Sequence, residues 1–137
     1  MHIRLPKPFL IKSQLLWLTF FLMWFSLLWI LSSMPGSGKP SPIPHLDKLA
    51  HYLYFCFFGI SIVGIHHRSF LIYHPWRCVW HTVLVCAAIG IIDEWHQCYT
   101  PLRSGADLLD WLADVFGGLS GAILLKHIYQ KFKFHHS

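Results

Sequence analysis

Four long apolar stretches constrain the fold of this chain more than any other feature of its sequence. They cover residues 15–31, 49–65, 76–95 and 108–125, and each contains 17 to 20 residues. An α-helix rises about 1.5 Å per residue, so each stretch would extend about 25–30 Å, the thickness of the hydrocarbon core of a bilayer. The chain is therefore expected to cross a membrane four times.

The spans are expected to be helices rather than barrel strands. Backbone inside a bilayer must satisfy its own hydrogen bonds, and these stretches lack the alternation of apolar and polar residues that barrel strands show. Composition agrees: 55% of the 137 residues are hydrophobic and 12% are charged, against about 25% charged residues in soluble domains. We predict an all-α fold, a membrane four-helix bundle. The four cysteines lack the paired spacing of a disulfide framework or a zinc site.

Basic residues predict the orientation of the bundle, because positively charged segments tend to remain in the cytoplasm. We expect a cytoplasmic N-terminus and C-terminus, with a basic tail (1–14), a four-span domain (15–125) and a second basic tail (126–137). The tails and the +5 net charge then indicate contact with the lipid bilayer rather than with nucleic acid. Cleavage of residues 15–31 as a signal peptide is disfavoured by their length. The expected cytoplasmic basic residues are Arg4, Lys7, Lys12, Arg68, Arg77, Lys126, Lys131 and Lys133.

All six acidic residues fall at or near the other ends of the last three spans, which are the expected outer ends. They are Asp47, Asp93, Glu94, Asp107, Asp110 and Asp114. None is used to solubilise the tails. A separation of charge this complete predicts one polar site at the outer face of the membrane.

Helical spacing lets these residues converge. Residues three or four apart share a helix face, which groups Asp47 with His51 and Asp93 with Gln97. On the last span the acidic stripe continues as glycine, and Gly117 and Gly121 form a small-xxx-small pair that favours close helix packing.

Asp114 is the deepest of the acids, because it lies about 10 Å along a helix that starts near residue 107. A charge at that depth is expected to be paired or functional. Arg103, in the short link before the last span, is the expected partner of Asp107, Asp110 or Asp93. No cofactor motif or metalloprotease spacing is present, so neither a cofactor nor a metal is predicted. The candidate polar site comprises Asp47, Lys48, His51, Asp93, Glu94, Gln97, Arg103, Asp110 and Asp114.

The segments that carry these residues resemble those of the VanZ-like family of small multi-pass bacterial membrane proteins. They read DKLAH at 47–51, DEWHQ at 93–97, PLRS at 101–104 and DWLADVFG at 110–117. The resemblance covers roughly residues 30–125, including the SSMP at 32–35, although members often have Asn where this chain has Asp114. The motif positions that carry over are Asp47, Lys48, His51, Asp93, Glu94, Gln97, Pro101, Arg103, Asp110, Asp114 and Gly117.

The resemblance implies a protein of the bacterial cytoplasmic membrane that acts in the cell envelope, since the family is named for a protein associated with teicoplanin resistance. We expect a lipid-linked or glycopeptide-like molecule at the site, with Arg103 and Lys48 holding a phosphate or carboxylate. Glu94 or Asp114 would then exchange a proton with the help of His51.

Two other classes of function fit the same residues. The first is a non-enzymatic membrane scaffold whose acidic and arginine cluster is structural, and the second is a proton- or cation-coupled transporter. Whether the chain is an enzyme, and whether it forms a homo-oligomer through the Gly117 and Gly121 face, are left open by the sequence.

Overall fold

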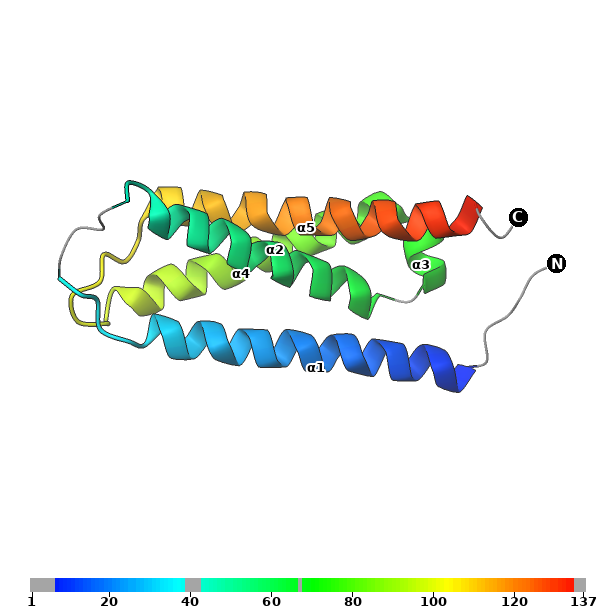
Figure 1. The fold of residues 1–137 in the computed structure, drawn as a ribbon, viewed down its shortest axis with the longest axis horizontal. Coiled ribbons are helices and arrows are strands. Elements are labelled where there is room, and N and C mark those ends of the chain that lie inside the picture. The colour runs from blue at the N-terminus through cyan, green and yellow to red at the C-terminus, as the bar shows by residue number, and fades with distance from the viewer. Residues whose placement is uncertain (1–6, 39–42, 67, 135–137) are drawn as a thin grey trace.

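The computed structural model describes residues 7–38, 43–66 and 68–134, and within them the regular structure is entirely helical. The helices are α1 (Lys7–Ser32), α2 (Leu46–Ile65), α3 (Arg68–Tyr73), α4 (Pro75–Gln97) and α5 (Leu108–Phe134). The four long helices run along one common direction, and the start of α1 and the end of α5 lie at the same end of the bundle (Figure 1). The predicted all-α bundle is confirmed.

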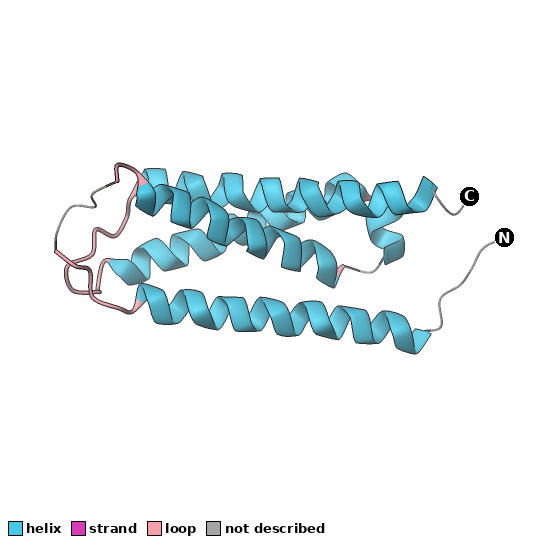
Figure 2. Ribbon diagram, in the orientation of Figure 1, coloured by secondary structure: helices cyan, strands magenta, loops and turns pink. Residues whose placement is uncertain are grey.

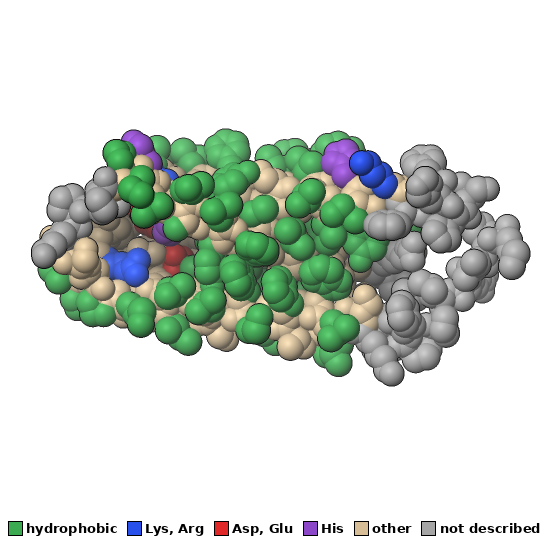
Figure 3. Space-filling view, in the orientation of Figure 1, with side chains coloured by type: hydrophobic (Ala, Val, Ile, Leu, Met, Phe, Trp, Pro, Cys, Tyr) green, Lys and Arg blue, Asp and Glu red, His purple; other side chains and the backbone are tan. Residues whose placement is uncertain are grey.

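Four helices are long and apolar enough to cross a membrane. Their candidate spans are Ser13–Ser32, Leu46–Ile65, Pro75–Gln97 and Leu108–Lys131. Large hydrophobic side chains cover most of the visible surface of the bundle (Figure 3), as expected for a surface in contact with lipid tails. Multi-pass membrane character therefore follows from the structure as well as from the sequence.

The helix boundaries differ from the sequence prediction in several places, and α1 begins at Lys7, within the expected N-terminal tail. The linker that precedes α4 contains the short helix α3, and α5 continues beyond residue 125, where a tail was expected to begin. Lys126 lies on this continuation, where it is only 4% exposed and its ammonium lies 3.7 Å from the centre of the Trp76 ring. A cation over an aromatic face is stabilised by the ring electrons, so this lysine packs as part of the bundle.

The closest helix pair is α2 with α5, and glycines make it possible. A side chain added at Gly117 or Gly121 would collide with the backbone carbonyl of Tyr52 or Cys56 on α2. Gly59 of α2 lies in the same way against the backbone of α5 at Gly118. The glycine face of α5 is thus covered within the chain, and it brings the polar residues of α2 and α5 together.

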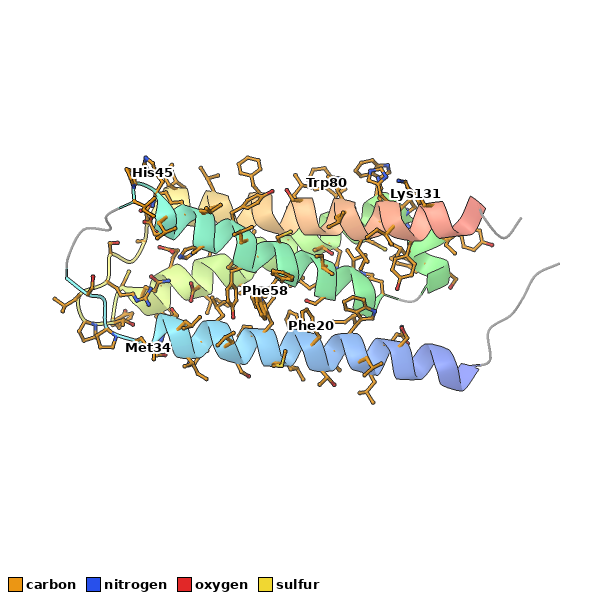
Figure 4. The ribbon with its side chains drawn as sticks, in the orientation of Figure 1. Phe20, Met34, His45, Phe58, Trp80 and Lys131 are labelled. Atoms are coloured by element: carbon orange, nitrogen blue, oxygen red, sulfur yellow. The ribbon has the colours of Figure 1, made fainter. Side chains whose placement is uncertain are left out.

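Helix α1 is the most peripheral of the spans. Only 6% of its apolar stretch is buried, against 39% for α2. It packs on α2 largely through aromatic rings, including Phe21 against Phe58 with ring centres 5.4 Å apart. Phe58 lies in the space between the two helices (Figure 4). The longer loops gather at the end of the bundle opposite the termini (Figure 2), where the candidate site lies.

Candidate functional site

Lys48 is the centre of an ion-pair network at this end of the bundle. Its Nζ lies 3.1 Å from Asp47 Oδ2, 2.8 Å from Asp107 Oδ2 and 3.0 Å from Asp110 Oδ1. The network joins the first turn of α2 to the first turn of α5 and to the loop before it. The lysine is therefore surrounded by carboxylates.

Asp107 links this network to α4. Its backbone N–H donates a hydrogen bond of 2.7 Å to Glu94 Oε2 near the end of α4. The Asp107 carboxylate precedes the α5 span, and the hydrogen bond from the Lys48 ammonium lowers the pKa of Asp107 below its ordinary value. The carboxylate is thus ionised at neutral pH.

His51 and Asp114 form a second pair one level deeper in the bundle. His51 Nδ1 lies 2.9 Å from Asp114 Oδ1, and the Asp114 side chain is fully buried. Helix α2 supplies the histidine and α5 the carboxylate. The pair exists because the glycines of α5 allow the two backbones to approach so closely.

Within the described part of the chain, three buried carboxylate oxygens in this layer have no hydrogen-bond partner: Asp93 Oδ1, Glu94 Oε1 and Asp114 Oδ2. The other oxygen of Asp93 accepts a hydrogen bond of 2.8 Å from Gln97 Nε2. A buried acceptor without a partner costs about 1–3 kcal/mol, and more when it is charged. The layer is therefore suited to take up protons or a cation.

Arg103 corrects the sequence prediction, because it contacts none of the acids. Its Nε donates to Met34 O at 3.0 Å and its Nη2 to Leu31 O at 2.6 Å. These carbonyls belong to the C-terminal end of α1 and the residues just after it, where backbone oxygens lack helical partners and attract cations. Among the described residues no carboxylate lies within 4.0 Å of the guanidinium.

A cavity of about 770 Å³ opens between these groups. Figure 3 shows the hollow at this end of the molecule, with basic, acidic and histidine side chains exposed in it. Much of its wall is formed by loop residues, namely 35–38, 43–45 and 102–104. Figure 4 labels His45 and Met34, which lie at this end of the bundle. Its charged and amide-bearing lining residues are Asp47, Lys48, His51, Gln97, Arg103 and Asp110.

The structure thus brings eight of the nine predicted polar residues into two connected layers. Arg103 lines the same cavity but is bound to backbone carbonyls of Leu31 and Met34. Two features lay outside the predicted list. Asp107 shares the helical stripe of Asp110 and Asp114, so its spacing was a usable signal. The carbonyls that hold Arg103 belong to Leu31 and to Met34 of the SSMP segment, and a contact with backbone carbonyls leaves no side-chain signal in the sequence.

Two groups of these residues could hold a metal ion. One ligand atom from each of His51, Glu94 and Asp110 lies within 4.8 Å of the other two, and the same holds for Asp47, Asp107 and Asp110. The first group combines an imidazole with two carboxylates and comes from three different helices.

The fold and the site together define a class of protein: a small four-span membrane protein with an acidic, histidine-containing pocket at one end. The family model VanZ/LLP1 matches residues 7–130, and the chain belongs to this family. Comparison with curated proteins and with solved structures gave no significant match.

Proposed function

We propose that this VanZ-family protein acts in the bacterial cell envelope by binding the anionic group of a lipid-linked or glycopeptide-like molecule in the pocket at the outer face of the cytoplasmic membrane. The observation that carries the proposal is Arg103. It lines a polar cavity beside four membrane-length helices, and no described carboxylate neutralises it. A guanidinium presents several donors in one plane and suits a phosphate or carboxylate.

The two cations of the pocket have different tasks in this proposal. Lys48 contacts three carboxylates, so its charge is already balanced. Arg103 uses Nε and Nη2 for backbone carbonyls, which are neutral, and retains its other N–H groups for a ligand. The ligand's anionic group is therefore assigned to Arg103, with Lys48 holding the helices in place.

The position of the pocket favours a ligand with an apolar part. The cavity opens where the spans α2, α4 and α5 begin or end, so a polar head group in it would lie beside lipid tails. The α4 end adds Gln97, whose amide is a further donor at the cavity wall. A lipid-linked phosphate meets both requirements, and so does a lipoglycopeptide.

A purified protein in detergent micelles tests the proposal with two probes, undecaprenyl phosphate and teicoplanin. We expect saturable binding of at least one probe, seen as a stoichiometric complex by native mass spectrometry, and at least tenfold weaker binding by Arg103→Gln. Arg77→Gln is the matched control, because Arg77 lies at the opposite end of α4. Absence of binding of both probes, or equal binding by Arg103→Gln, would contradict the proposal.

A further inference from the structure

We propose that His51, Glu94 and Asp110 bind a divalent transition-metal ion, of the class of Zn²⁺ or Mn²⁺. One ligand atom from each residue lies within 4.8 Å of the others, and the residues come from α2, α4 and α5. Zinc holds histidine nitrogens and carboxylate oxygens at about 2.0–2.2 Å. In the tetrahedral geometry that zinc prefers, ligand atoms on one ion are about 3.4 Å apart, so the three side chains would have to move toward one another by about an ångström to close the site.

The unpartnered Glu94 Oε1 is the independent sign of a ligand. Glu94 is buried, with only 5% of its surface exposed. Its Oε2 accepts a hydrogen bond from the Asp107 N–H, and its Oε1 has no hydrogen-bond partner among the described residues. Its carboxylate faces the His51 and Asp110 ligand atoms. A buried carboxylate oxygen without a donor is costly, and a metal ion at this point would satisfy it.

The negative charge of the buried layer also favours a bound cation. Asp93, Glu94, Asp110 and Asp114 are all at most 6% exposed. The cationic groups that contact these four carboxylates are Lys48, on Asp110, and His51, on Asp114. If all four carboxyls are ionised and His51 is protonated, two negative charges in this buried layer have no cationic partner among the described residues. A divalent cation would remove that imbalance.

The hydrogen bond between His51 and Asp114 suits a metal-binding imidazole. Metal-ligating histidines commonly donate their second ring N–H to a carboxylate, which fixes the tautomer and orients the ring. His51 Nδ1 lies 2.9 Å from Asp114 Oδ1, so Nε2 is the nitrogen left for a metal. Asp114 would then be a positioning residue, and Asp110 would keep Oδ1 on Lys48 and offer Oδ2.

Metal binding is measured without the anionic ligand proposed above, so either proposal can fail without the other. Protein purified in detergent is stripped with EDTA, incubated with Zn²⁺ alone or Mn²⁺ alone and desalted, and bound metal is quantified by inductively coupled plasma mass spectrometry. We expect about one equivalent of one of these ions in the wild type and at least tenfold weaker binding by His51→Asn and Glu94→Gln.

His96→Asn is the matched control and should bind like the wild type. His96 lies at the same end of α4, but its ring stacks on Trp29 and bonds to Ser33 rather than joining the three-residue group. X-ray absorption at the zinc edge reports the ligands of the bound ion in the wild type, so the result does not depend on whether a variant folds. We expect one imidazole nitrogen, with oxygen atoms as the other ligands. Any one of three results would overturn the proposal. The first is a wild type that retains neither ion, the second is sulfur ligation of the bound zinc, and the third is binding as strong as in the wild type by a folded Glu94→Gln variant.

Discussion

At the residue scale, the site depends on which basic group each acid contacts. The sequence predicted that the acids would gather and that Asp114 would need a partner, and it identified His51 as a residue of the neighbouring polar face. It did not predict that Lys48 would form ion pairs with both Asp107 and Asp110, or that Arg103 would bind a backbone carbonyl of α1 instead. That choice depends on the path of the loop before α5, where Leu102 and Ala106 adopt left-handed backbone conformations.

Replacement of the Lys48 ammonium should destabilise the protein. Lys48→Met leaves Asp47, Asp107 and Asp110 without this cation. Asp110 is the buried carboxylate of the three, and leaving a buried polar group without its partner costs about 1–3 kcal/mol. We expect reduced membrane abundance and a lower melting temperature in detergent. Lys131→Met, at an exposed position of α5, is the control. Equal stability of the two variants would show that the network contributes little.

Acid should weaken the site through Asp107. The pKa of this carboxyl is lowered in the folded protein by the Lys48 hydrogen bond, so the unfolded chain takes up its proton first as pH falls. The stabilisation is full above the ordinary pKa of about 3.8 and is lost as pH falls through the folded value. Melting temperatures measured from pH 7 to pH 3 should fall less steeply for Asp107→Asn. Parallel curves would refute this assignment.

At the element scale, the pairing of α2 with α5 positions the polar layers. The spacing of Gly117 and Gly121 predicted that another helix would pack closely on α5. It could not predict which helix, because spacing within one helix does not identify the partner. The structure places both glycines against α2. The His51 and Asp114 pair lies just along the same contact, so the packing of glycine and the geometry of the site are coupled.

Enlarging one of these glycines should separate the helices. Gly121→Val would place a branched side chain against the Cys56 carbonyl, and overpacking of this kind typically costs about 1–3 kcal/mol. We expect a lower melting temperature together with weakened metal and ligand binding at the distant pocket. Leu124→Val is the control, because Leu124 is 50% exposed on the outer side of α5. Unchanged stability of Gly121→Val would argue against the close contact.

At the scale of the whole molecule, four apolar stretches were enough to predict the bundle, because a bilayer leaves few alternatives to spanning helices. The end of the last helix was harder to predict. Lys126 resembles a tail residue in the sequence, and only its packing on Trp76 from α4 shows that it lies within the bundle. Such contacts between distant segments determine where a helix ends, and a hydropathy pattern does not contain them.

The orientation of the molecule is testable with a native residue. Cys98 is exposed at the pocket end, whereas Cys78 and Cys86 are buried and Cys56 lies within α2. A membrane-impermeant maleimide should label Cys98 in intact spheroplasts. Tyr73, 74% exposed at the other end, provides the control. Tyr73→Cys in a Cys98→Ser background should be labelled only after lysis, and the reverse pattern would place the pocket in the cytoplasm.

If the pocket is the working site of this VanZ-family protein, a substitution in it should abolish the protein's function in the cell, which complementation measures. Arg103→Gln removes the guanidinium that lines the pocket, which has no carboxylate within 4.0 Å among the described residues, and the glutamine amide can still donate to the carbonyls at the end of α1. The variant and the wild type are expressed in a strain from which the gene has been deleted, and glycopeptide susceptibility is scored beside membrane abundance. We expect lost activity at normal abundance, whereas full activity at normal abundance would show that the pocket is not the working site.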